Sequence, residues 1–206
     1  MKLILRDIRK EYNGACILHG LSYTFESGKV YGISGGSGSG KTTLLRCIAR
    51  EYDYTGTDTV IEAGKSFFKT DVFEYALLDK EIVMPRMITP RQYIKQCIKE
   101  HKGSIFGCSL EEYAELFGLP ADKLDVVMKR FTGEELQIIQ MIAVSIIKPA
   151  VVLMDEIIGY FVITQLFFEA LSESIVIIAE DDAEKMETYC DEILYLENGS
   201  FSSGVK

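Results

Sequence analysis

The chain has 206 residues, 48% of them hydrophobic, which is enough to bury a core in one domain with a small subdomain. Its formal net charge of −9 argues against a nucleic-acid partner, because such a partner requires a basic face. Its five cysteines are odd in number and include no C-x-x-C pair. We therefore expect neither a disulfide framework nor a zinc site, but reduced thiols in a cytoplasmic protein.

No segment is expected to cross a membrane. The N-terminal apolar run breaks after three residues, at Arg6, and is too short for a signal peptide. The longest apolar region, Ile138 to Met154, is interrupted by Gln140, Ser145 and the Lys148-Pro149 pair. Any membrane association is therefore expected to come through a partner chain.

Three strands are predicted near the N-terminus, at Leu3–Arg9, Ile17–Phe25 and Val30–Ile33. The turn dipeptides Asn13-Gly14 and Ser27-Gly28 separate them.

The most informative segment follows the third strand and precedes a helix-forming run, Thr43–Ala49. It matches the phosphate-loop pattern G-x-x-x-x-G-K-[ST] at every specified position. Its residues are Gly35, Gly36, Ser37, Gly38, Ser39, Gly40, Lys41 and Thr42. A flexible Gly/Ser linker is the alternative, and the flanking strand and apolar helix disfavour it.

This pattern predicts binding of a nucleoside triphosphate. The glycines let backbone N–H groups curl around phosphate oxygens, and the helix N-terminus, through Thr43, adds a favourable dipole. Lys41 is expected to reach the β- and γ-phosphates, and the Thr42 hydroxyl to ligate Mg²⁺.

A helical region is predicted in the middle of the chain, after a β-rich stretch that ends near Leu78. Its helices are Thr89–Lys102, Leu110–Phe117 and Ala121–Lys129. A longer helix, Glu134–Ile147, is closed by the Lys148-Pro149 pair.

A buried strand, Ala150–Met154, then ends in Asp155-Glu156. Open α/β sheets bind ligands at the carboxyl ends of their strands. Asp155 is therefore a candidate Mg²⁺ ligand, directly or through water, and Glu156 a candidate base for the water that attacks the γ-phosphate. A plain strand-to-loop junction is the alternative interpretation.

The order of these motifs resembles that of the ATP-binding cassette (ABC) ATPases, the nucleotide-binding subunits of ABC transporters, over essentially the whole chain. The resemblance implies an α/β fold: a P-loop NTPase core of mixed or parallel sheet with an N-terminal antiparallel β portion. The chain would form one ATP-binding domain, with residues 1–80 and 150–206 as core and about 81–148 as an inserted helical subdomain that carries the signature helix. Tyr12 stands where the family stacks an aromatic ring on adenine, although a half-exposed strand tyrosine is the alternative.

The family signature, usually Leu-Ser-Gly-Gly-Gln, is occupied here by Phe131-Thr132-Gly133-Glu134-Glu135. In the family this helix start contacts the γ-phosphate of the ATP held by the other subunit. Thr132 and Gly133 retain that capacity, whereas Glu134 places a bulky anion close to a polyanion and is expected to weaken the closed dimer.

Three other family positions are also degenerate. Glu180 stands where the family has a histidine that contacts the γ-phosphate, and an ionised carboxylate cannot donate a hydrogen bond, so slow hydrolysis is expected. The loop after Glu156 reads Gly159-Tyr160-Phe161-Val162 and lacks the Ser-Ala-Leu-Asp pattern. The family's linking glutamine falls at Asp79 or Lys80, and neither is assigned its role.

Two functions follow from this resemblance. The first is an ATP-binding subunit that couples Mg-ATP binding and slow hydrolysis to a separate permease chain, at the inner face of the cell membrane. The second is an ATP-binding switch or pseudo-ATPase that forms the degenerate half of a heterodimer. Either one implies ATP, Mg²⁺ and a second cassette as partners.

Two further interpretations remain open at this point. A nucleotide kinase shares the phosphate loop, but the scattered Arg86, Arg91 and Arg130 do not form an arginine-bearing lid. The apolar segment Met84–Ile88 lies near the place where the family's permease docks, and it is equally compatible with the core of the helical subdomain.

Overall fold

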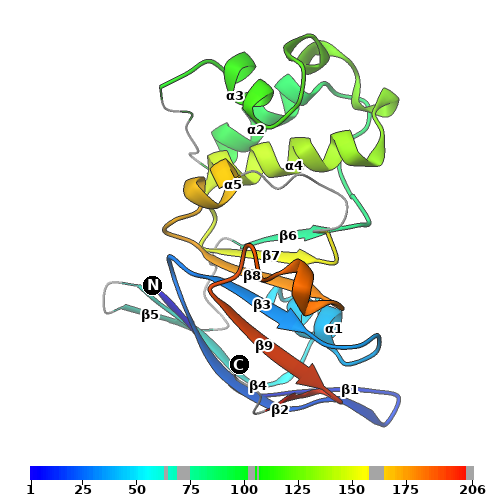
Figure 1. Ribbon diagram of the computed structural model, residues 1–206, viewed down its shortest axis with the longest axis vertical. Helices are drawn as coiled ribbons and strands as arrows, with labels where there is room; N and C mark the ends of the chain where they lie inside the picture. The colour runs from blue at the N-terminus through cyan, green and yellow to red at the C-terminus, as the bar shows by residue number, and fades with distance from the viewer. Residues whose placement is uncertain (63–64, 69–74, 102–104, 106, 158–164, 203–206) are drawn as a thin grey trace. The chain divides into compact units, whose positions relative to one another are not determined.

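The computed structural model describes residues 1–62, 65–68, 75–101, 105, 107–157 and 165–202, and Figure 1 shows them in chain order. The chain divides into two compact units. The first unit comprises Met1–Asp79, Pro149–Gly159 and Ser172–Lys206, and the second comprises Lys80–Lys148 and Tyr160–Leu171.

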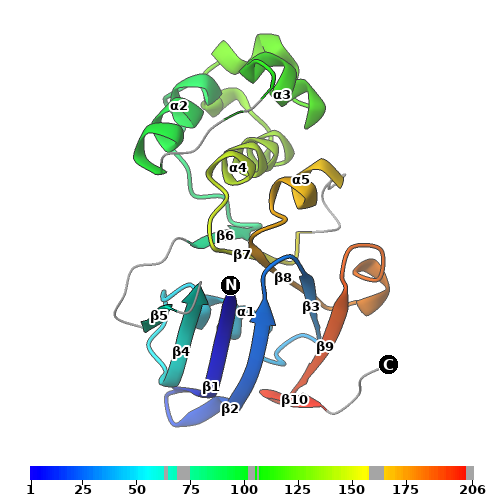
Figure 2. The ribbon, with the colours of Figure 1, turned by 90° about the vertical axis from the view of Figure 1, so that its left-hand side faces the viewer.

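An antiparallel sheet forms the N-terminal part of the first unit. Its strand order is β2-β1-β4-β5, which Figure 2 shows side by side. The strands are β1 (Lys2–Tyr12), β2 (Ala15–Glu26), β4 (Thr55–Glu62) and β5 (Lys65–Phe68). The predicted Asn13-Gly14 turn joins β1 to β2, and both of its residues have positive φ.

The second sheet of this unit has the order β10-β9-β3-β8-β7-β6. All neighbouring strands in it are parallel except β9 and β10. The strands are β3 (Val30–Ser34), β6 (Tyr75–Asp79), β7 (Val151–Asp155), β8 (Ile175–Glu180), β9 (Glu192–Glu197) and β10 (Ser200–Ser202). The predicted fold class, a mixed or parallel core sheet with an antiparallel N-terminal portion, is confirmed.

One hydrophobic core joins both sheets to helix α1 (Lys41–Ile48). Among its buried side chains are Leu3, Leu18, Ile33, Leu44, Leu45, Leu153 and Ile177. Every residue of β7 and β8 is buried. Covering on both faces explains why these two strands consist of nearly unbroken apolar runs.

The second unit is helical. It contains α2 (Pro90–His101), α3 (Leu110–Leu116), α4 (Gly133–Ile147), α5 (Gln165–Ala170) and the short 3₁₀ helices η1 (Ala121–Asp125) and η2 (Met128–Arg130). The prediction of one helix over Ala121–Lys129 is therefore wrong. Val126 and Val127 are extended there, and the Met128 N–H donates to the Ile88 carbonyl at 3.0 Å instead of continuing a helix.

The sequence-based division assigned all of 150–206 to the core, whereas α5 belongs to the second unit. Helix α5 contacts α4, and its Phe167 is fully buried. Hydrophobic burial of this aromatic ring accounts for the difference. The altered loop Gly159–Val162 lies outside the described residues.

The turn between β9 and β10 links β2 to the phosphate loop through two backbone hydrogen bonds of Gly199, which we call the Gly199 clamp. The Gly199 N–H donates to the Ser39 carbonyl at 3.0 Å, and the Gly199 carbonyl accepts from the His19 N–H at 2.9 Å. Gly199 has φ +70°, and a Cβ added there would lie 1.9 Å from the Ile17 carbonyl oxygen. Only glycine fits this approach.

Replacing Gly199 by alanine is expected to lower the free energy of unfolding by about 3 kcal/mol, because the Cβ overlaps a backbone carbonyl. Gly14→Ala is the matched control: Gly14 has φ +81°, but no atom lies within 4 Å of its Cβ position. The control should lose only about 1 kcal/mol, from the left-handed backbone. Urea unfolding of both variants measures the difference, and equal losses would contradict the clamp.

Candidate functional site

Three parallel strands end side by side at one edge of the second sheet. Strand β8 pairs with β3 so that Glu180 lies opposite Ser34, and with β7 so that Ala179 lies opposite Asp155. The phosphate loop begins directly after Ser34. The predicted phosphate loop, Asp155 and Glu180 are therefore brought together by strand register, at the carboxyl edge where such sheets bind ligands.

Strand alternation places the two acids on opposite faces of the sheet. Asp155 shares a face with Ala179 and Ile33, whose side chains belong to the core that contains α1. Glu180 is the next residue along β8 and points to the other face. Both carboxylates are buried, so each requires a hydrogen-bonding or cationic partner at this edge.

The phosphate loop presents its backbone to solvent. Gly36, Ser37 and Gly38 are exposed, and no atom lies within 4 Å of a Cβ built at either glycine. The loop turns back through a hydrogen bond from the Ser39 N–H to the Gly36 carbonyl at 3.1 Å. Gly40, with φ +108°, then starts α1.

The groups at this loop fit a phosphate chain. Among the described residues, the buried Ser39 hydroxyl has no hydrogen-bond partner. The first N–H groups of α1, at Lys41, Thr42 and Thr43, are the donors that a helix leaves unpaired. Buried or helix-end donors next to open space are the features that an anionic ligand satisfies.

Lys41 is held by groups of the protein itself. Its side chain is only 4% exposed, and its ammonium donates to the Gly35 carbonyl at 2.6 Å and to Asp181 Oδ1 at 2.5 Å. Our sequence reasoning did not include Asp181. The signal was present, because Asp181 follows the end of an apolar strand as Asp155 ends another.

Glu156 follows β7 in the left-handed region, with φ +52°. Its N–H donates to the Ala179 carbonyl at 2.9 Å, which fixes its backbone to β8, and its side chain is half-buried. A non-glycine residue held in this conformation is strained, and such strain is frequent at functional sites.

Oxygen donors for a divalent cation are available at two elements. Thr42 is exposed at the start of α1 and Asp155 is buried at the end of β7. Within the described ranges, no group of three or more His, Cys, Asp or Glu side chains is arranged to hold a metal. The pair of oxygen donors at Thr42 and Asp155 suits Mg²⁺, because Mg²⁺ takes one or two protein oxygens together with substrate phosphates.

Tyr12 ends β1 with 41% of its surface exposed. The Tyr52 ring meets it edge-on, with centroids 5.8 Å apart and planes at 88°. The Lys10 ammonium lies 4.7 Å from the Tyr12 ring centre. This cluster presents an aromatic surface, and adenine stacking on Tyr12 remains a prediction.

Asp79, one of the two residues at the position of the family's linking glutamine, forms an ion pair within the protein. Asp79 ends β6 opposite Asp155, and its carboxylate accepts from Arg46 of α1 at 2.7 Å. Arg46 also pairs with Glu51 at 3.3 Å. Sequence reasoning missed this pairing, because no motif links Arg46 to Asp79.

The signature residues form the start of α4 in the second unit. Thr132 is the N-cap, and its hydroxyl accepts from the Glu135 N–H while the Glu135 carboxylate accepts from the Thr132 N–H. Lys123 also donates to Glu135, and this hydrogen bond together with the cap lowers the pKa of Glu135. The capping box fixes the helix start.

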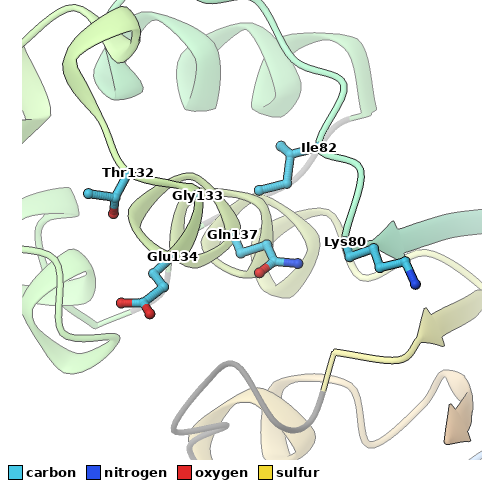
Figure 3. Close-up of a pocket in the computed structure, with 6 residues that line it drawn as sticks. All are labelled: Lys80, Ile82, Thr132, Gly133, Glu134 and Gln137. Carbon is cyan, nitrogen blue, oxygen red and sulfur yellow. The ribbon is translucent and has the colours of Figure 1, made fainter.

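A pocket of about 570 Å³ opens beside this helix start, and Figure 3 shows the side chains around it. It is lined by Lys80, Ile82, Thr132, Gly133, Glu134 and Gln137. Thr132, Gly133 and Glu134 are exposed. The Glu134 carboxylate and the Lys80 ammonium point away from each other (Figure 3).

Comparison with known proteins decides the family. Residues 18–159 match the sequence profile of the family described as ABC transporter. The chain belongs to the ABC transporter family. Its predicted identity as a nucleotide-binding subunit of that family is confirmed, and the family generally hydrolyses ATP. No helix in the described part of this ABC subunit has the length and apolar character needed to span a membrane.

Several relatives of this ABC subunit carry ATP-binding names. The tungstate uptake system ATP-binding protein TupC of Peptoclostridium acidaminophilum is 28% identical over 97% of this chain and 96% of its own length. The glutamine transport ATP-binding protein GlnQ of Bacillus subtilis is 30% identical over 75% of this chain and 66% of its own. The spermidine/putrescine import protein PotA of Spiroplasma citri is 26% identical over 96% of this chain, which spans 59% of PotA.

Solved structures support the same fold. An ATP-binding subunit of an ABC transporter superposes with a TM-score of 0.78 at 18% identity, covering 100% of this chain and 90% of its own. An ABC transporter ATP-binding protein of Pyrococcus furiosus gives 0.76 at 22% identity, covering 95% and 98%. The roles of the individual site residues remain predictions.

Thr132→Ala is expected to lower the free energy of unfolding by about 1 kcal/mol, because α4 loses its N-cap. Ser109→Ala is the matched control, since Ser109 caps α3 through a second capping box. If Thr132 also contacts ATP, only its variant should lose ATP-dependent dimerisation, measured by sedimentation. Equal effects of both variants on dimerisation would restrict Thr132 to a structural role.

Proposed function

We propose that this chain couples Mg-ATP binding and slow hydrolysis to a separate membrane permease, as one of two cassettes at the cytoplasmic face of the membrane. The observation that carries this proposal is the register of β3, β8 and β7. In this register, β3, which leads into the phosphate loop, and β7, which ends at Asp155 before Glu156, lie on either side of β8 and end at one sheet edge.

Each side chain at that edge has a distinct task in the proposal. Lys41 and the loop N–H groups bind the phosphates, and Thr42 and Asp155 hold Mg²⁺. The bound cation would supply charge neutralisation for the transferred phosphoryl group. Glu156 orients and deprotonates the attacking water. Tyr12 stacks on the adenine.

Slow hydrolysis is proposed from Glu180 and Glu134. Glu180 is buried at the end of β8, where the family uses a hydrogen-bond donor, and an ionised carboxylate only accepts. Glu134 adds an exposed anion at the start of α4, which is expected to oppose a second nucleotide there. These two residues also support the alternative function, a switch that binds ATP as the degenerate half of a heterodimer.

The segment Met84–Ile88 supports a permease contact in the second unit. Met84 is buried, whereas Val83 is 92% exposed and Met87 74% exposed. Two exposed apolar side chains that flank a buried one favour a docking surface over the alternative of subdomain core. Import is the direction named for PotA, and uptake is that named for TupC.

Phosphate release from the purified chain with saturating Mg-ATP, over a wide range of protein concentration, tests this function. We expect a low rate that rises more than linearly with concentration and disappears in Lys41→Ala. Glu156→Gln should change this low rate little, because Glu180 and Glu134, rather than activation of the water, are expected to limit it. A large fall in that variant would indicate a competent homodimeric ATPase, and ATP binding without release above the Lys41→Ala control would favour the switch.

Glu180→His should raise the turnover number at least about tenfold, because a histidine donates a hydrogen bond to the γ-phosphate where a carboxylate cannot. The double variant Glu180→His/Glu156→Gln is the control, and it should lose the gain. Steady-state kinetics measures both. Unchanged turnover in the single variant would show that Glu180 does not limit hydrolysis.

A further inference from the structure

The buried ammonium of Lys41 has a complete set of acceptors within the protein. Its Nζ lies 2.5 Å from Asp181 Oδ1, 2.6 Å from the Gly35 carbonyl oxygen and 3.4 Å from the Gly36 carbonyl oxygen. A lysine ammonium has three N–H donors. A phosphate oxygen can therefore bind Lys41 only by replacing one of these acceptors.

Asp181 is the acceptor that costs least to replace. Its side chain is 54% exposed, so water can satisfy its oxygens once Lys41 leaves. The Gly35 and Gly36 carbonyls are parts of the loop backbone and move only with it. The Asp181 backbone is tied to β3, because the Ser34 hydroxyl donates to its carbonyl at 3.4 Å. Rotation of one side chain is then sufficient.

We infer that Asp181 is an internal ligand of Lys41 that occupies the place of a phosphate oxygen and competes with the β- and γ-phosphates of the nucleotide. The inference rests on the proposed nucleotide site. Binding becomes an exchange of one anion for another on the same cation. Lys41 is neutralised before and after the exchange, so no step leaves a buried charge without a partner.

This exchange lowers the affinity for nucleotides. Part of the interaction between Lys41 and phosphate is offset by the lost contact with Asp181, as in any equilibrium between competent and blocked states. The offset applies to ligands with a β-phosphate, which Lys41 reaches, and not to adenosine monophosphate. Removing the Asp181 charge should therefore tighten binding of ATP and ADP alone.

Isothermal titration of Asp181→Asn and Asp181→Ala with ATP, ADP and AMP tests the inference. Both variants should bind ATP and ADP about two- to fivefold more tightly, which is the range of a partly exposed ion pair, with AMP unchanged. The nucleotide-free variants should also unfold at a lower temperature, because they lose the contact with Lys41. Opposite signs for stability and affinity distinguish competition from a purely structural role, which would lower both.

Asp182→Asn is the matched control. Asp182 is the next residue and is exposed, and its side chain accepts from the Glu184 N–H at 3.0 Å, a contact that asparagine can keep. Its affinities should equal those of the wild type. In a Lys41→Ala background, Asp181→Asn should have no effect on triphosphate binding.

Several results would overturn the inference. Weaker or unchanged ATP binding in both Asp181 variants would show that Asp181 does not compete for Lys41. An equal gain in the Lys41→Ala background would show that it acts through another group. Absence of ATP binding by the wild type and by every variant would instead refute the proposed nucleotide site, and the inference with it.

Discussion

The parallel pairing of β8 with its two neighbours is the constraint on which the site depends. Because β8 lies between β3 and β7, their carboxyl ends reach one edge together. The register then decides which side chain faces α1 and which faces away. A shift of one residue would exchange the faces of Ala179 and Glu180 and place a second carboxylate against the core. Apolar packing of the two wholly buried strands β7 and β8 therefore fixes the positions of Asp155 and Glu180.

Burial also explains why charged side chains near this edge are paired with side chains of opposite charge. Lys41, Asp155 and Glu180 are all buried, and an isolated charge at such depth would be costly. Asp181 compensates Lys41 directly. Arg46 compensates Asp79 on the neighbouring strand. Lys41 and Asp79 are thus each paired with an opposite charge of the protein, and in the proposed site a polyanion would bind Lys41 by exchanging its partner.

Sequence patterns predicted the parts that depend on local physics. The phosphate loop has its own motif, and the apolar run Ala150–Met154 predicted β7. The pairings Lys41 with Asp181 and Arg46 with Asp79 escaped prediction, because they join residues far apart along the chain and depend on strand order. Helix α5 and the 3₁₀ helices escaped for a related reason. Burial of Phe167 and the bond from Met128 to Ile88 are tertiary effects that outweigh local propensity.

Glu180, the last residue of β8, and Asp181, the residue after it, are expected to affect different quantities. Glu180 is buried within β8, and in the proposed function its charge would affect the hydrolytic step. Asp181 lies one residue later and its side chain is largely exposed, so we infer that it would rotate without disturbing the sheet and that its charge would affect binding. A change at Glu180 should therefore alter turnover with little effect on affinity, and a change at Asp181 should do the reverse. The two proposed roles differ because the chain passes, within one residue, from the buried sheet to a solvent-exposed loop.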